Sequence, residues 1–270
     1  MTRNITDRGI FMNTYTKKER NMYLLGLLGQ NMIYNIIASG MAFYFQSVIF
    51  IPAMAISILM GVARVWDAIN DPMMGTIVDK TRSKWGKCRP YLFHVPSAVL
   101  IVTVLTFVNG QYSASNLASK NVLIIGWAAV SYILWGMTYT AGDIPLWGIT
   151  SLMTESNKDR EKLLSLARIV AAIGGAAVMF SVVPLSQTVG AMFTEGGMSQ
   201  KDGLQWGFIV ACGIMSLVGC GLFQCAAFAK ERVSQPSDES KTFLQNVKIM
   251  WACKSFRRVL ISNVIKAPSS

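Results

Sequence analysis

Six long apolar blocks separated by short polar connections restrict this sequence to a helical membrane fold. Each block reaches the length that a helix needs to cross a bilayer, about 20 residues, and 52% of the 270 residues are hydrophobic while only 14% are charged. The fourth block is long enough to include a loop as well. We therefore expect an all-α membrane protein with six transmembrane helices, at about residues 22–47, 52–78, 91–110, 121–153, 163–192 and 205–229.

Basic residues gather in every second connection, and this asymmetry predicts the orientation in the membrane. Of the net charge of +11, most lies before the first block, at 80–89, at 158–168 and after residue 229, whereas the opposite connections offer only Lys120 and Lys201. Loops rich in Lys and Arg stay in the cytoplasm. We expect a multi-pass protein of the cell membrane with both termini cytoplasmic. A nucleic-acid binder would instead group its basic residues on one soluble face, so no nucleic-acid partner is expected.

Other classes of site find little support in the sequence. The five cysteines lie in expected spans or cytoplasmic connections, which argues against structural disulfides. The one histidine, His94, is interpreted as an interfacial residue, and no Cys or His pair has the spacing of metal ligands. About twenty mostly polar residues precede the first block, so the first span is expected to stay as an anchor and not to be a cleaved signal peptide.

Charged side chains inside the second block require a function. Arg64, Asp67, Asn70 and Asp71 interrupt an apolar run, and an ionised side chain at the centre of a bilayer costs about 2.5–3.5 kcal/mol unless it is paired, hydrated or ion-bound. On a helix these four residues fall within an arc of about 120°. They can therefore line one polar cavity, with Arg64 either neutralising Asp67 one turn away or reaching the cytoplasmic acids.

The connection after the second block combines a glycine, an acid and several bases. Gly75, Asp79, Lys80, Arg82 and Gly86 are expected to form the end of a helix, a charged turn and the start of a new helix. Gly75 would allow another helix to approach closely. On spacing alone, the alternative interpretation is an ordinary positively charged cytoplasmic loop.

These segments resemble a known family. Gly75-x-x-x-Asp79-Lys80 and the bases after it are similar to the loop between helices two and three of the major facilitator superfamily. Asp67-Ala-Ile-Asn70-Asp71-Pro72-x-x-Gly75 resembles, more narrowly, the melibiose-type carriers among the glycoside–pentoside–hexuronide:cation symporters. A second segment agrees, with Tyr139-Thr140-x-x-Asp143-Ile144-Pro145-x-Trp147 similar to their fourth helix. The resemblance covers roughly residues 20–258 and implies a sugar:cation symporter of the cell membrane.

The resemblance implies a cation site at Asp67, Asn70, Asp71 and Thr140. Oxygen ligands suit hard cations, and two neighbouring carboxylates would repel each other without one. The coupling ion is expected to be Na⁺, Li⁺ or H⁺, with no metal beyond such a Na⁺ and no organic cofactor. Gly75, Asp79, Lys80, Arg82 and Gly86 would form the cytoplasmic gating loop.

The same resemblance implies a sugar site at Asp143, Trp147 and Arg168. Carboxylate and guanidinium groups make charge-assisted bonds to hydroxyls, and an indole covers the apolar face of a pyranose. The alternative is that Trp147 is an interfacial anchor and Asp143 an end-of-span charge. Melibiose-type carriers have a third sugar-binding aspartate in helix one, where this chain has the neutral Asn31. Asn31 is expected to alter hydroxyl recognition, or to accommodate a hexuronide.

Length is the larger departure, since carriers of this superfamily have about twelve spans in two halves with the substrate between them. The resemblance therefore implies the N-terminal six-helix half of such a carrier, most simply a fragment. A separately encoded second half or a second copy of the chain would be the alternative partner. The expected organisation is a cytoplasmic segment (1–21), a six-helix bundle (22–229), a middle loop with an amphipathic helix (230–258) and the start of a seventh helix (259–270).

Two other functions compete with the symporter. A sensor or scaffold could keep the sugar-binding face without transport, and an integral-membrane enzyme could use Asp67 and Asp71 as a carboxylate pair. For such an enzyme, the sequence offers no nucleophile–base pair, no metal-binding cluster and no cofactor-binding loop. We therefore expect a protein that is not an enzyme and whose partners are a small sugar and the lipid bilayer.

Overall fold

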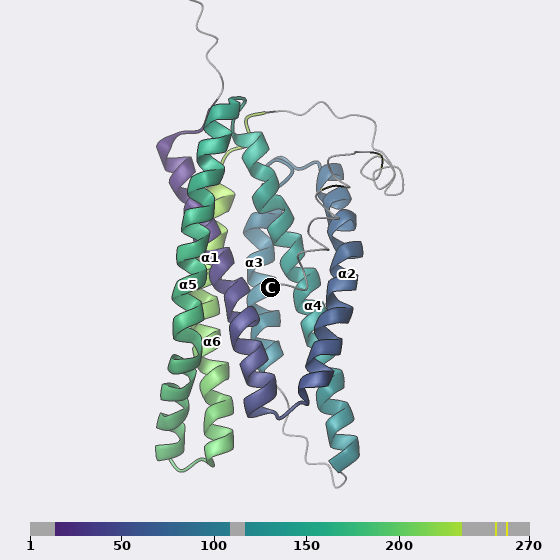
Figure 1. Cartoon of the computed structure of the whole chain (residues 1–270). Coiled ribbons are helices and arrows are strands. Elements are labelled where there is room, and N and C mark those ends of the chain that lie inside the picture. The colour runs from purple at the N-terminus through teal and green to yellow at the C-terminus, as the bar shows by residue number, and fades with distance from the viewer. Residues whose placement is uncertain (1–13, 109–116, 234–251, 253–257, 259–270) are drawn as a thin grey trace, which may run out of the picture.

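The fold is known from a computed structural model, which describes residues 14–108, 117–233, 252 and 258 (Figure 1). Every regular element in this part of the chain is helical. The helices are α1 (Lys17–Asn35), the π-helical η1 (Ile36–Met41) and η2 (Tyr44–Val48), α2 (Ala53–Lys80), α3 (Arg89–Phe107), α4 (Leu117–Met153), α5 (Asn157–Glu195), α6 (Gln200–Gln224) and the 3₁₀-helical η3 (Cys225–Phe228). The predicted amphipathic helix, apart from residues 252 and 258, and the predicted seventh helix lie outside the described residues.

The described helices overlap the predicted blocks, with one clear difference. The expected loop in the fourth block is wrong, because α4 runs without interruption and Pro145 lies inside it. A proline removes one backbone hydrogen bond, which neighbouring helices can compensate in a membrane. In the described part of the chain, α2, α3, α4, α5 and the α6–η3 helix are long and apolar enough to cross a membrane. The first span stays a prediction.

The helices run roughly parallel in two groups (Figure 1). One group is made of α1, α5 and α6, which pack closely on one another, while α3 joins α6 to α4 and α2 packs mainly on α4. Glycines allow the tight contacts: Gly29 of α1 faces the backbone of Gly219 in α6, and a Cβ on Gly174 would come within 2.6 Å of the Leu28 carbonyl oxygen. The close packing of the first group leaves α2 attached through α4.

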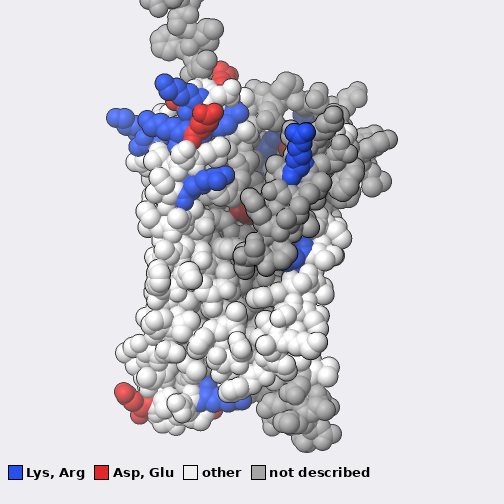
Figure 2. Space-filling view, in the orientation of Figure 1, with Lys and Arg blue, Asp and Glu red and all other residues white. Residues whose placement is uncertain are grey.

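One end of the bundle carries most of the visible charge. Figure 2 shows Lys and Arg gathered where α1 and α5 begin, with a long and mostly uncharged surface beyond them. We call this the basic end. An uncharged stretch bounded by charged residues is what a bilayer requires of the surface that faces its lipid tails.

The segment after η3 ties several helices together at the basic end. The Glu231 carboxylate accepts hydrogen bonds from the backbone amides of Lys87 and Cys88, at 2.8 Å each, and of Arg89, at 3.3 Å. Amides at the start of a helix have no partner within the helix, and a carboxylate there also complements the helix dipole. Glu231 therefore caps α3 from a position more than 140 residues further along the chain.

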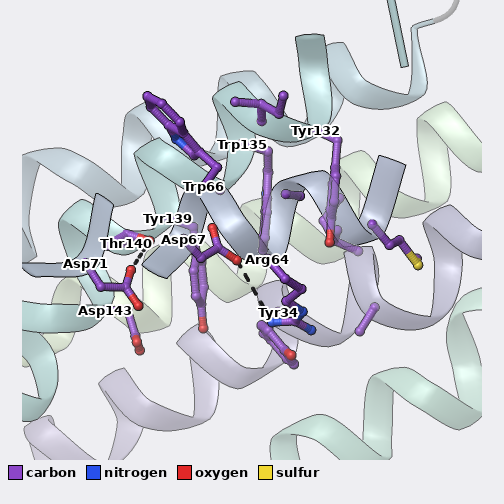
Figure 3. A pocket seen from close by; sticks show the side chains of 16 residues that line it. Tyr34, Arg64, Trp66, Asp67, Asp71, Tyr132, Trp135, Tyr139, Thr140 and Asp143 are labelled. Carbon is purple, nitrogen blue, oxygen red and sulfur yellow. Dashed lines mark hydrogen bonds and ion pairs between the residues drawn. The ribbon is translucent and has the colours of Figure 1, made fainter. Parts of the chain in front are cut away.

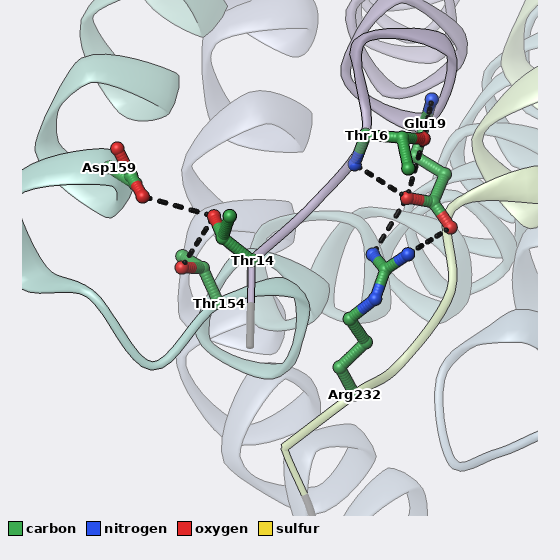
Figure 4. Close-up of polar contacts among 6 residues, drawn as sticks. All are labelled: Thr14, Thr16, Glu19, Thr154, Asp159 and Arg232. Atoms are coloured by element: carbon green, nitrogen blue, oxygen red, sulfur yellow. Dashed lines mark hydrogen bonds and ion pairs between the residues drawn. The ribbon is translucent and has the colours of Figure 1, made fainter. Parts of the chain in front are cut away.

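Arg232 makes the corresponding connection to α1 and α4. Its guanidinium donates to both Glu19 oxygens, at 2.7 and 3.0 Å, while Thr16 and Glu19 form a capping box at the start of α1 (Figure 4). The backbone amides of Arg232 and Val233 donate to the Leu152 carbonyl at 2.7 and 2.9 Å. We call residues 229–233 the clasp, because they join the ends of α1, α3, α4 and α6.

The predicted gating loop is shorter than expected. Gly75, Asp79 and Lys80 belong to α2, so only Arg82 and Gly86 lie in the connection between α2 and α3. A Cβ on Gly75 would meet nothing within 4 Å, so no close helix approach occurs there in the described part of the chain. Gly86 has a different role, because its φ of +111° is favourable for glycine and its α-carbon lies against the Glu231 carboxylate.

Gly86→Ala should destabilise the protein more than Gly197→Ala. Both glycines have a positive φ, but a Cβ would meet nothing at Gly197 and would displace the Glu231 carboxylate at Gly86. The backbone strain alone costs on the order of 1 kcal/mol, and loss of the α3 cap adds about as much again. Thermal unfolding in detergent would measure both variants. Equal losses of stability would show that the cap contributes nothing.

Acidification should test the Arg232–Glu19 pair. Burial opposes ionisation of Glu19, which precedes the first predicted span, but hydrogen bonds from Arg232 and Thr16 outweigh it and hold the pKa of this carboxyl below its usual value. The pair therefore stabilises the fold above the unfolded-state pKa and stops doing so as pH falls through the lower folded-state value. Below about pH 4.5, wild type should lose more stability than Glu19→Gln; parallel curves would refute this.

Candidate functional site: a polar cavity between α1, α2 and α4

A polar cavity of about 300 Å³ opens between α1, α2 and α4. Figure 3 shows aromatic side chains along it and three carboxylates, Asp67, Asp71 and Asp143, among them. The cavity is lined by Tyr34, Ile37, Ala38, Met60, Ala63, Arg64, Trp66, Asp67, Asp71, Tyr132, Ile133, Trp135, Gly136, Tyr139, Thr140 and Asp143.

The packing of α2 on α4 brings the predicted acids together. Asp67 and Asp71 are one turn apart on α2, and Thr140 and Asp143 are three residues apart on α4, so each pair shares a helix face. The Thr140 hydroxyl donates to Asp71 Oδ1 at 3.3 Å, which links the two helices. Three carboxylates and a hydroxyl provide the oxygen ligands that a hard monovalent cation needs.

Asn70 does not line this cavity. It is only 4% exposed, and its Nδ2 has no hydrogen-bond partner in the described part of the chain. A buried amide without a partner is costly. The structure thus brings Asp67, Asp71 and Thr140 of the predicted cation site to one cavity and places Asn70 beside it.

Arg64 faces Asp67 within the cavity. The shortest distance between Arg64 Nη1 and Asp67 Oδ2 is 4.0 Å, and Tyr34 and Tyr132 lie on either side of the guanidinium (Figure 3). Of the two alternatives that the sequence left open, the structure therefore favours the neighbouring acid over the distant cytoplasmic ones.

Asp143 is held by two donors from different helices. Its Oδ1 accepts from Gln30 Nε2 of α1 at 2.6 Å and from Trp147 Nε1 of α4 at 3.0 Å. Trp147 does not line the cavity, so its indole is engaged through its N–H and not through an open ring face. Gln30 was not predicted from the sequence, since a single amide in an apolar block has no charge or spacing to distinguish it.

The other two predicted sugar contacts lie outside the cavity. Asn31 Nδ2 donates to the Leu27 carbonyl at 3.1 Å and to Gln30 Oε1 at 2.5 Å, so Asn31 reaches Asp143 only through Gln30. Arg168 is exposed on α5 and is not a lining residue.

Membrane-length helices around a cavity that holds several carboxylates are typical of helical membrane transport proteins. Residues 22–268 match the family model described as MFS/sugar transport protein. The chain belongs to this family and, within it, to the glycoside–pentoside–hexuronide:cation symporters. These relatives carry the names of transporters and not of enzymes.

Three curated relatives illustrate the similarity. The chain is 31% identical to the uncharacterized symporter YnaJ of Bacillus subtilis over 83% of this chain and 45% of that protein. It is 30% identical to the isoprimeverose transporter of Lactiplantibacillus pentosus, over 90% of this chain and 48% of that protein. It is 28% identical to the putative glycoside/cation symporter YagG of Escherichia coli, over 91% and 50% respectively. The chain spans about half the length of the curated relatives it matches.

Proposed function

We propose that this chain provides one half of a secondary active transporter that carries a glycoside, pentoside or hexuronide together with Na⁺, Li⁺ or H⁺. The observation that carries the proposal is the cavity in which the acids of α2 and the acid of α4 lie next to each other. Charged groups in the membrane interior typically mark the path of a substrate or an ion.

The charges of the side chains suggest which residues would hold the cation and which would hold the sugar. Asp67, Asp71 and Thr140, supported by the buried Asn70, would hold the cation, and Asp143, with Trp147 beside it, would hold the sugar. Asp67 and Asp71 repel each other when both are ionised, and a bound cation removes this repulsion. The cation would thereby favour binding of the sugar in the same cavity, and by linkage the sugar would favour the cation equally.

The assembly belongs to the proposal as well. Six spans with both termini in the cytoplasm would place the basic end, with the connection at Arg82 and Gly86, on the cytoplasmic side of the cell membrane. The cavity needs a second body to close it during alternating access. A second six-helix half, continuous with this chain or separate from it, is the partner that the half-length match to relatives favours over a second copy.

Asp71→Asn should abolish the dependence of sugar affinity on the cation. In wild type, coupling between two sites usually changes affinity by about 5- to 150-fold, so isoprimeverose should bind several-fold more tightly in Na⁺ or Li⁺ than in choline, or at low pH if H⁺ is the coupling ion. Isothermal titration of the purified protein in nanodiscs would measure this.

The matched control is Asp202→Asn, the same change on α6 outside the cavity. It should keep the cation effect. A cation response in Asp71→Asn equal to that of wild type would contradict the site assignment. If wild type binds no glycoside, pentoside or hexuronide from a panel that includes isoprimeverose, in any cation, the proposed function is wrong.

Trp147→Ala should weaken sugar binding by about tenfold, which corresponds to about 1.4 kcal/mol, and should leave cation binding nearly unchanged. The reason is that the Trp147 indole donates a hydrogen bond to Asp143, the acid assigned to the sugar, and makes no hydrogen bond to the acids of α2. Trp206→Ala, the same change at an exposed position on α6, is the control. Unaltered sugar affinity in Trp147→Ala would exclude its role.

A further inference from the structure

The hydrogen bonds of Gln30 leave it no donor for a ligand. Its Nε2 carries two hydrogens, and it donates to Asp143 Oδ1 at 2.6 Å and to the Tyr139 hydroxyl. Its Oε1 accepts from Asn31 Nδ2 at 2.5 Å. Gln30 is 4% exposed and does not line the cavity. Its amide is therefore engaged in holding other groups.

The group that Gln30 holds is the one carboxylate of α4 that reaches the cavity. Asp143 Oδ1 accepts from both Gln30 and Trp147. A carboxylate oxygen with two donors is well satisfied. Within the described part of the chain no hydrogen bond reaches Asp143 Oδ2, and Asp143 lines the cavity. The donors on Oδ1 thus determine which oxygen is available to a ligand.

The direction of these bonds fixes the rotation of the carboxylate. Gln30 donates from α1, whereas Trp147 donates from the next turn of α4 itself. Two donors on one oxygen, from two helices, hold the carboxyl plane more firmly than one flexible contact would. Asn31 in turn orients the Gln30 amide. Of the two polar atoms of that amide, Oε1 can accept a hydrogen bond from Asn31 and Nε2 cannot, so Oε1 faces Asn31.

We propose that Gln30 is a positioning residue that fixes the Asp143 carboxylate so that only Oδ2 faces the cavity. Asp143 then accepts hydrogen bonds from the substrate's hydroxyls through Oδ2 alone, instead of through both carboxylate oxygens. The statement about the sugar rests on the proposed function, but the statement about the carboxylate does not. Asn31 acts one step further out, through Gln30.

A spectroscopic test needs no sugar. In the full chain with ¹⁵N-labelled tryptophan, the indole N–H signal of Trp147 is assigned by its loss in Trp147→Phe. Gln30→Leu should shift this signal, because Asp143 rotates when one of its two donors is removed, although no Gln30–Trp147 hydrogen bond occurs in the described part of the chain. Gln224→Leu is the matched control, because Gln224 also donates from a helix, to the Phe93 carbonyl and the Ser97 hydroxyl, outside the cavity. It should leave the signal unchanged.

A double-mutant cycle tests whether Gln30 acts through Asp143. Gln30→Leu should weaken isoprimeverose binding by about tenfold when it is introduced into the wild-type protein. The same substitution should weaken binding by less than about twofold when it is introduced into the Asp143→Asn variant. Asp143→Asn should itself bind poorly, because its amide oxygen must face Gln30 and Trp147, which turns an N–H donor instead of an acceptor toward the cavity. If Gln30→Leu does not fold, Gln30→Asn, which keeps the amide and shortens its reach, takes its place.

The outcomes separate the two proposals. A shifted Trp147 signal in a protein that binds no sugar would support the positioning role and overturn the proposed function. Unchanged Trp147 signal and sugar affinity in the Gln30 variant would overturn the positioning role and leave the proposed function standing. Equal weakening by Gln30→Leu in wild type and in Asp143→Asn would also overturn it, since Gln30 would then act on the sugar directly.

Discussion

The structure depends on a compensation that the membrane imposes: a carboxylate among apolar helices must have a partner. Asp67 has Arg64, Asp71 has the Thr140 hydroxyl, and Asp143 has the amide of Gln30 and the indole of Trp147. These interactions differ in strength. Asp67 has only a long ion pair at 4.0 Å, whereas Asp143 has two donors on one oxygen. In the proposed transporter, the weakly compensated acids of α2 would gain most from a bound cation, and the firmly held acid of α4 would be left to the sugar.

The location of the acids was predictable, and so were their neighbours Arg64 and Thr140, but the partner of Asp143 on α1 was not. Apolar blocks and a helical period of 3.6 residues were sufficient to place Asp67 and Asp71 on one face, because both signals lie within one helix. Gln30 and Asp143 are more than 100 residues apart, and only the packing of α1 near α4 joins them. Neither residue carries a local signal of that contact.

Three further features of the fold differ from the predictions. The expected loop in the fourth block followed from its length, yet Pro145 is accommodated within α4. The gating loop was assigned to include Gly75, Asp79 and Lys80 on the strength of a resemblance, but α2 continues to Lys80. Asn31 was expected in the cavity on the strength of a resemblance, and its amide is instead used by Leu27 and Gln30. Which way a polar side chain turns depends on neighbours from other helices.

The clasp also has a mechanical meaning. Residues 229–233 follow η3 directly and are anchored to the starts of α1 and α3 and to the end of α4. A pull transmitted along the chain beyond Val233 is therefore shared among several helices instead of unwinding the end of α6. Among the described helices, α2 shares in this anchoring mainly through α4, on which it packs.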